Sequence, residues 1–148
     1  MHTETVADIL KTKGSEVVCT TPEATLADVC GLLTSKGVGA ALVKDRQGAV
    51  VGVISERDIV RGIANLGLNV LCQTVDGLMT RKLVVCRLDT PVDAVLSSMT
   101  GNRFRHLPVM DGDQLLGIVS IGDAVKYRLA ELEYEAKFMR DYIQGTSR

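Results

Sequence analysis

Apolar residues along the chain follow two spacings, one typical of strands and one typical of helices. Short apolar runs around residues 17–19, 39–43 and 49–54 are rich in Val and Ala, and such runs bounded by turn residues predict buried strands. Between the first two, apolar positions recur at helical spacing over residues 26–33, which predicts an amphipathic helix. A further helix is expected to begin at Ser55. The first half therefore predicts the order β-α-β-β-α.

The second half of the chain repeats this order, although few residues are identical. Residues 84–86 match residues 17–19, and a Gly-x-x-Ser-x-x-Asp segment at 117–123 matches the one at 52–58. Apolar and turn positions agree between these matches. The sequence therefore indicates an internal duplication, which must be recognised before any motif is interpreted.

Each copy is expected to open with a short helix, at residues 6–10 and 75–79, and the second copy to have its first strand at 83–86. A unit of about 60 residues is marginal by itself, so the copies are expected to pack sheet to sheet. The predicted fold class is α/β, with two tandem repeats forming one pseudo-two-fold module. The predicted boundaries are 5–65 for the first repeat, 66–74 for a linker, 75–130 for the second repeat and 131–148 for a C-terminal helix extension.

The last helix is predicted to be unusually long, reaching about residue 143, and to carry an apolar stripe with heptad spacing. The stripe consists of Val125, Leu129, Leu132, Ala136, Met139 and Ile143. Such a stripe can pack on its own domain or form a seam with another helix. Because residues past about 130 have no counterpart in the first repeat, we expect a subunit contact, in a homodimer.

Composition and charge exclude several classes of function. A formal net charge of −1 and 3% aromatic residues leave neither a basic surface nor a stacking platform for nucleic acid. The longest charge-free run, residues 62–75, is too short to cross a bilayer. The first residues lack the pattern of a signal peptide. We expect a cytoplasmic protein with no nucleic-acid or membrane partner.

Metal binding is not expected either. The chain has four cysteines, none in a C-x-x-C pair, and two histidines, which do not make up the usual ligand sets of a zinc site.

A Ser-x-x-Asp motif opens the last helix of both repeats, with Ser55 and Asp58 in the first and Ser120 and Asp123 in the second. The motif is typical of a capping box, in which Ser caps the helix and the acid returns to the backbone. It is also typical of a ligand site, because a helix N-terminus suits phosphate and a nearby carboxylate can accept ribose hydroxyls. Recurrence in both copies favours a ligand site, although a duplication would copy a cap as well.

These features, with Arg105-His106-Leu-Pro-Val in the second copy, resemble a pair of cystathionine-β-synthase (CBS) domains. The resemblance covers about residues 5–130, and within this range the sequence is similar to stand-alone bacterial CBS-pair proteins. It implies a regulatory module and not an enzyme, with an adenosine-containing ligand in two clefts between the copies. AMP and NAD(H) are the favoured ligands, and ATP and S-adenosylmethionine are less favoured.

The resemblance also implies roles for individual residues. Asp58 and Asp123 would hold ribose, and Ser55 and Ser120 would lie near phosphate. The remaining residues that it assigns to the ligand are Lys13, Arg57, Arg103, Arg105 and His106 near phosphates, the backbone around Val18 beside adenine, and Ala40.

Ala40 stands in the first copy where the second has His106, so the first copy lacks the Arg-His pair. The two clefts are therefore expected to be unequal.

A second hypothesis is an interaction module whose clefts stay empty and whose C-terminal helix recruits a partner protein. Catalysis has the least support, because the sequence contains neither a P-loop nor a G-x-S-x-G motif. The sequence does not identify the protein that a sensor of this kind would regulate.

Overall fold

The computed structural model describes residues 4–102 and 104–146. In the first repeat the elements are α1 (Val6–Lys13), β1 (Cys19–Thr20), α2 (Leu26–Lys36), β2 (Ala40–Lys44), β3 (Val50–Ser55) and α3 (Glu56–Leu66). Further along the chain they are the 3₁₀ turns η1 (Leu68–Cys72) and η2 (Val75–Gly77), then α4 (Val92–Asn102), β4 (His106–Asp111), β5 (Gln114–Ser120) and α5 (Ile121–Thr146). The predicted α/β class and tandem repeat are confirmed.

The helix predicted at 75–79 is wrong in type, because the chain forms only the 3₁₀ turn η2 there. The reason lies immediately downstream, where Thr80 forms an antiparallel bridge with Val53. The Thr80 N–H donates to the Val53 carbonyl over 2.8 Å, and the Val53 N–H donates to the Thr80 carbonyl over 3.0 Å. An extended backbone at Thr80 prevents a longer helix.

The strand predicted at 83–86 is also wrong among the described residues, where only Cys86 of this segment pairs, in a single parallel bridge to Val109. The next residue that would face β4 is Leu88, whose carbonyl instead accepts the Ala7 N–H of α1 over 3.0 Å. The second sheet therefore has two strands, β4 and β5, whereas the first has three in the order β1-β2-β3.

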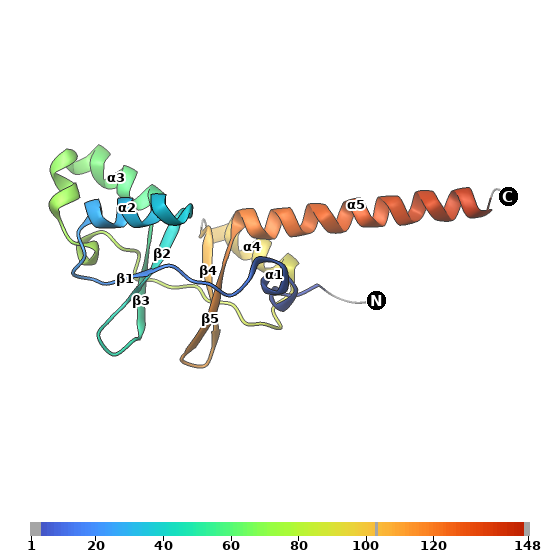
Figure 1. Ribbon diagram of the computed structural model, residues 1–148, viewed down its shortest axis with the longest axis horizontal. Coiled ribbons are helices and arrows are strands. Elements are labelled where there is room, and N and C mark those ends of the chain that lie inside the picture. Colours follow the sequence, from blue (N-terminus) through green and yellow to red (C-terminus); the bar gives the residue numbers. More distant parts are fainter. Residues whose placement is uncertain (1–3, 103, 147–148) are drawn as a thin grey trace.

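Both sheets are built around a hairpin, and the two hairpins point in the same direction (Figure 1). Asp45 shapes the first tip, because its Oδ1 accepts the N–H groups of Gln47 and Ala49 over 3.0 and 2.9 Å. Gly112 lies at the second tip with a φ of +58°, a conformation that glycine adopts without strain. The predicted hairpins are confirmed.

The two repeats exchange their opening segments. Val6 and Ile9 of α1 are buried in the core of the second repeat, around Val109. Reciprocally, Val75 of η2 and the neighbouring Met79 are buried in the core of the first repeat. Each core is therefore completed by the other repeat, and after α1 the chain returns to its own repeat, where β1 pairs with β2.

A third apolar cluster joins the two sheets, which confirms the expected sheet-to-sheet packing. Leu42 and Val53 of the first sheet are buried there with Leu115 and Ile118 of the second packed against them. Leu42 is fully buried, so this interface holds the two repeats together.

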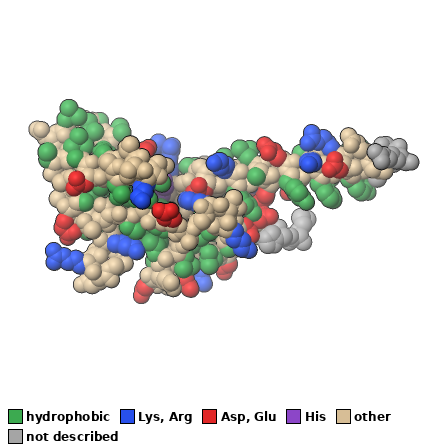
Figure 2. Space-filling model, viewed as in Figure 1, with side chains coloured by type: hydrophobic (Ala, Val, Ile, Leu, Met, Phe, Trp, Pro, Cys, Tyr) green, Lys and Arg blue, Asp and Glu red, His purple; other side chains and the backbone are tan. Residues whose placement is uncertain are grey.

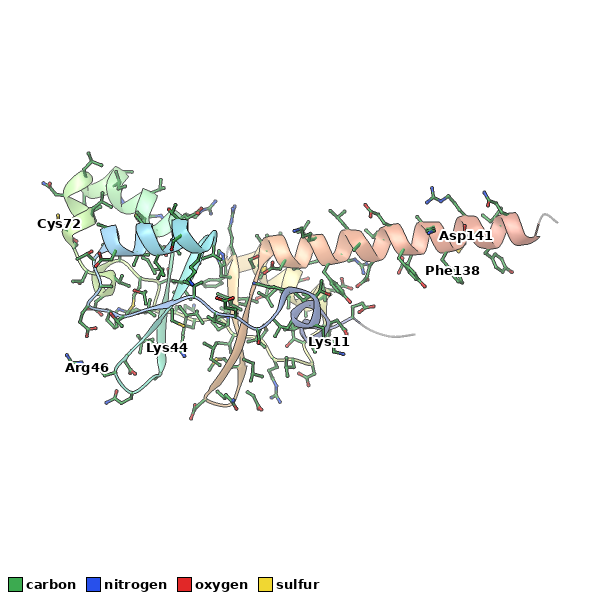
Figure 3. All side chains as sticks on the ribbon, in the orientation of Figure 1. Lys11, Lys44, Arg46, Cys72, Phe138 and Asp141 are labelled. Atoms are coloured by element: carbon green, nitrogen blue, oxygen red, sulfur yellow. The ribbon has the colours of Figure 1, made fainter. Side chains whose placement is uncertain are left out.

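Helix α5 begins against the second repeat and then projects well beyond it (Figure 1). Leu129, Leu132 and Met139 are 55%, 46% and 55% exposed, and Phe138 lies far from both sheets (Figure 3). Figure 2 shows hydrophobic side chains along one edge of this projection. The predicted long helix is confirmed, and these three stripe residues do not pack on their own domain. In the described part of the chain, no helix has the length and hydrophobicity needed to cross a membrane.

Candidate functional site

A cavity of about 800 Å³ lies where the two repeats meet. Its walls come from the start of α3, from residues 80–84, from the residues that lead into β4, and from the start of α5. The polar residues that line the cavity include Ser55, Arg57, Asp58, Thr80, Arg105, His106 and Ser120. Two helix N-termini therefore border one cavity, one from each repeat.

The first wall is organised by the capping box of α3. Ser55 is the last residue of β3 and the N-cap of α3, and its hydroxyl accepts the Asp58 N–H over 3.2 Å. In return, the Asp58 Oδ2 accepts the Ser55 N–H and hydroxyl over 2.9 and 3.0 Å. The Asp58 Oδ1 accepts the Thr80 hydroxyl over 3.3 Å and is 4.0 Å from an Arg61 nitrogen. This carboxylate oxygen retains acceptor capacity beside the cavity.

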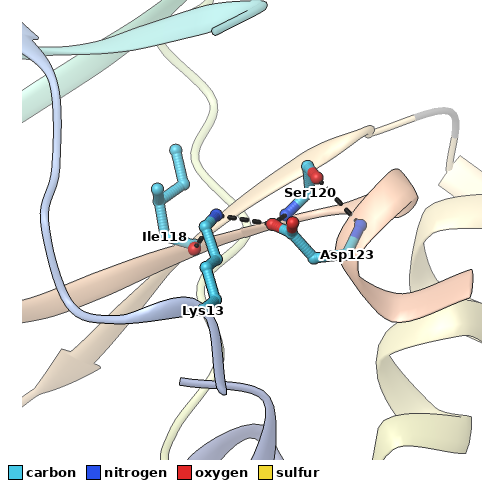
Figure 4. A network of polar contacts seen from close by, with 4 residues as sticks. All are labelled: Lys13, Ile118, Ser120 and Asp123. Carbon is cyan, nitrogen blue, oxygen red and sulfur yellow. Dashed lines mark hydrogen bonds and ion pairs between the residues drawn. The ribbon is translucent and has the colours of Figure 1, made fainter. Parts of the chain in front are cut away.

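The second repeat has the same capping box in a different charge environment (Figure 4). The Asp123 Oδ2 accepts the Ser120 N–H over 2.9 Å, and the Ser120 hydroxyl accepts the Asp123 N–H over 3.1 Å. In addition, the Lys13 Nζ lies 2.5 Å from the Asp123 Oδ2 and donates to the Ile118 carbonyl over 2.8 Å. Burial alone raises the pKa of Asp123, but the hydrogen bonds from Lys13 and Ser120 outweigh it and hold the pKa below its usual value.

Arg105 and His106 enter the cavity from the start of β4. The Arg105 carbonyl accepts the N–H of Ile121, which fixes the chain beside the first turn of α5. Burial, and then the charge of Lys13, lower the pKa of His106 below its ordinary 6.5. Asp123, Glu56 and Arg105 act on it more weakly: the two acids raise the pKa and the arginine lowers it. His106 is therefore a neutral ring at pH 7, able to donate one hydrogen bond.

The model of the CBS domain family matches the chain twice, at residues 5–65 and 75–130. The chain belongs to the CBS-domain family. Among curated relatives it is 36% identical over 150 residues to the CBS domain-containing protein CBSX3, mitochondrial, of Arabidopsis thaliana, an alignment that covers 95% of this chain and 72% of the relative. The resemblance found in the sequence is thereby confirmed.

Solved CBS structures share the fold. The CBS-domain containing protein ATU1752 from Agrobacterium tumefaciens is 40% identical, with a TM-score of 0.82, and the match covers 84% of this chain and 92% of that one. The CBS domain pair of protein MJ0100, solved with methylthioadenosine and S-adenosyl-L-methionine, has a TM-score of 0.78 at 23% identity, over 88% of this chain and 99% of that one.

Some residues assigned by the CBS resemblance lie at the cavity and others do not. Arg57 lines it together with the residues described above. Val18 instead packs against the first core, and its carbonyl accepts the Leu42 N–H over 2.9 Å. Ala40 is buried at the start of β2, and its neighbour Gly39 lines the cavity. Arg103 lies outside the described residues.

Lys13 and Asp123 meet each other and are not among the described residues that line this cavity. Asp58 therefore lies at the cavity, whereas Asp123, the corresponding residue of the second repeat, forms an ion pair with Lys13.

Four polar residues that line the cavity were not predicted from the sequence: Glu56, Arg61, Thr80 and Lys82. The Thr80 hydroxyl contacts Asp58. A signal was present: Thr80 precedes residues 84–86 at the same spacing at which Lys13 precedes residues 17–19. Leu83 and Val84 also line the cavity and were expected only as strand residues. Within residues 4–102 and 104–146, the structure contains no cluster of His, Cys, Asp and Glu suited to a metal ion.

Proposed function

We propose that this CBS pair is a regulatory sensor that binds AMP, or the AMP portion of NAD(H), in the cavity between its repeats. The observation that carries the proposal is the pairing of Asp58 in one wall with Arg105, His106 and the start of α5 in the opposite wall. A volume of about 800 Å³ lies within the range of small-molecule sites, roughly 300–1,000 Å³. One wall suits a sugar and the other suits a phosphate.

The chemistry of each wall supports this division. Asp58 retains a carboxylate oxygen that can accept ribose hydroxyls, as acidic residues do in dinucleotide-binding folds. At the N-terminus of α5 the N–H groups of Ile121 and Asp123 already donate to Arg105 and Ser120. The N–H of Gly122, which lines the cavity, and the positive end of the helix dipole favour phosphate. Arg105 adds a forked cation and His106 adds a neutral donor. Val53 and Leu83, which also line the cavity, provide aliphatic surfaces for adenine.

Charge favours a ligand of modest negative charge. Of the described lining residues, the cationic ones are Arg57, Arg61, Lys82 and Arg105, and the anionic ones are Glu56 and Asp58. This small positive excess complements a monophosphate or the diphosphate of NAD(H) better than a triphosphate, and it does not favour the sulfonium cation of S-adenosylmethionine. The adenosine-containing ligands of MJ0100 support the nucleoside class of ligand, with a different charge.

We propose binding and not catalysis for this cavity. Its serine and carboxylate, Ser55 and Asp58, are hydrogen-bonded to each other in the cap of α3. A ligand at this position can act as a signal only if it binds two states of the module with different affinity. A nucleotide that bridges the two walls has this property, because its affinity depends on how the repeats are placed.

We propose further that the module is a homodimer joined through α5. All six residues of the heptad stripe are exposed, including Leu129, Leu132 and Met139, and heptad stripes are buried in helix pairs. The charges that flank the stripe favour a second copy of this chain over an unrelated partner.

In a parallel pair of α5 helices, each g position faces the e position of the next heptad on the partner. With Leu129 at an a position, Arg128 faces Glu133 of the partner subunit and Glu135 faces Arg140 of the partner subunit. Both contacts join opposite charges. The helix is therefore complementary to itself.

Thermal denaturation in the presence of AMP, NADH, ATP or S-adenosylmethionine tests the function. We expect AMP and NADH to raise the melting temperature of the wild type and to have little effect on Asp58→Ala. If none of the four ligands changes the melting temperature or gives heat in calorimetry, the sensor proposal is wrong. The interaction-module hypothesis gains if deletion of residues 131–148 abolishes capture of a partner protein that Asp58→Ala still captures.

A further inference from the structure

Lys13 and Thr80 occupy equivalent places in the two repeats. Each precedes the matching Val-Val-Cys segment at the same spacing. Each also lies at or just beyond the end of an opening element that packs on the other repeat: Lys13 is the last residue of α1, and Thr80 follows η2. Lys13 therefore reaches the second repeat's Ser-x-x-Asp motif as Thr80 reaches the first one.

The two residues contact corresponding partners, although Thr80 reaches the Oδ1 of its aspartate and Lys13 reaches the Oδ2. Thr80 donates its backbone N–H to the Val53 carbonyl over 2.8 Å and its hydroxyl to Asp58 over 3.3 Å. Lys13 donates from its Nζ to the Ile118 carbonyl over 2.8 Å and to Asp123 over 2.5 Å. Ile118 and Val53 correspond in the repeat alignment. One ammonium group thus makes both contacts for which the other half uses a backbone N–H and a hydroxyl.

The two aspartates differ in what they can still accept. The Asp58 Oδ1 accepts a neutral hydroxyl at 3.3 Å and lies 4.0 Å from an Arg61 nitrogen, beyond hydrogen-bond distance, so it can still accept a hydrogen bond from a ligand. Asp123 is neutralised by Lys13, and the two side chains are 25% and 29% exposed. Because an ammonium group already compensates its charge, the Asp123 carboxylate is a weaker acceptor for ribose hydroxyls than the Asp58 carboxylate.

The cavity has the same asymmetry. Asp58 and Thr80 line it, whereas neither Asp123 nor Lys13 does so among the described residues. Figure 4 shows the Lys13 ammonium between the Ile118 carbonyl and the Asp123 carboxylate. The ion pair thus leaves a charge-compensated carboxylate at Asp123, whereas the carboxylate of Asp58 faces the cavity.

We infer that Lys13 closes the second of the two pseudo-symmetric nucleotide positions, so that each chain binds one adenine nucleotide, at Asp58. The inference rests on the proposed function, since it presumes that Asp58 holds ribose. Lys13 is thereby a residue that sets the number of ligands, and a neutral side chain in its place opens the second position.

Calorimetric titration with AMP tests this inference, because it measures the number of sites separately from affinity. We expect the wild type to bind one AMP per chain and Lys13→Thr, which copies Thr80, to bind two. Lys11→Thr is the matched control, because Lys11 lies on the same helix (Figure 3) and is expected to leave the wild-type value of one. Melting curves verify that each variant is folded.

The reciprocal exchange gives a second, independent outcome. In the double variant Lys13→Thr with Thr80→Lys, we expect one AMP per chain, with binding now abolished by Asp123→Ala and unaffected by Asp58→Ala. Two AMP per chain for the wild type overturn the inference and leave the proposed function standing. Weaker binding of AMP to Lys13→Thr, with no second site, also overturns it, because Lys13 then contacts phosphate. Absence of AMP and NADH binding from every variant contradicts the proposed function itself.

Discussion

Replacing Asp58 by Ala removes a carboxylate that has two separable energetic roles. In the folded protein it accepts the Ser55 N–H and hydroxyl over 2.9 and 3.0 Å, and loss of a helix cap costs about 1 kcal/mol. For a chain of this size, that cost lowers the melting temperature by roughly 2–4 °C. In the nucleotide complex it accepts ribose hydroxyls, and each such hydrogen bond to a charged group contributes about 1.5–3 kcal/mol. Losing two of them weakens AMP binding by roughly 100-fold or more.

The first repeat contains a matched control in Asp8. It occupies the same place in the capping box of α1, where its Oδ2 accepts the Thr5 N–H over 2.9 Å, and it does not line the cavity among the described residues. Asp8→Ala should therefore cost a similar amount of stability and leave AMP affinity unchanged. Urea denaturation gives the free energy of unfolding, and calorimetric titration gives the affinity.

One result refutes this reasoning. Suppose that Asp58→Ala loses as much stability as Asp8→Ala and that its AMP affinity stays within about threefold of the wild type. A threefold change is smaller than the contribution of a single hydrogen bond to a charged group. The Asp58 carboxylate would then be only a helix cap.

Three further predictions concern packing, protonation and assembly. Leu42→Ala opens a cavity between the two sheets, where Leu42 is fully buried, and should lower the free energy of unfolding in urea by about 2–5 kcal/mol; a loss below about 1 kcal/mol contradicts the packing described here. Burial and the charge of Lys13 hold the pKa of His106 below its ordinary 6.5, so the unfolded chain takes up a proton first. Stability should therefore fall as the pH drops below about 6.5, and His106→Gln should flatten this dependence; an equal slope in both proteins contradicts it. Leu132→Glu should convert the dimer to a monomer, as measured by light scattering. Leu68→Glu is the control, because Leu68 is an exposed apolar residue of η1, elsewhere on the surface, and this variant should remain a dimer. A monomeric wild type contradicts the proposed dimer.

Much of the fold is predictable because its signals are local. The hairpin tips follow from residues such as Asp45, whose side chain organises its own turn, and Gly112, whose positive φ suits glycine. The strand at 83–86 fails for a reason that apolar composition does not reveal. The Leu88 carbonyl, which would come next in the ladder, accepts the Ala7 N–H of α1, so pairing ends after Cys86.

The site divides in the same way. Ser55 and Asp58 are predictable because a capping motif lies within one turn of helix. The contact of Lys13 with Asp123 joins residues separated by 110 positions, and it depends on α1 crossing to the other repeat. Periodicity and turn signals describe one segment at a time and do not reveal such an exchange. Thr80 was missed for the same reason.

A crystal structure of the protein with AMP locates the nucleotide atom by atom and so shows whether AMP binds between the two repeats. We predict ribose hydroxyls within hydrogen-bond distance of the Asp58 carboxylate, with the phosphate against Arg105 and the Gly122 N–H at the start of α5. An AMP molecule bound outside this cavity, with the Asp58 carboxylate contacting only Ser55 and Thr80 as it does without ligand, contradicts the account.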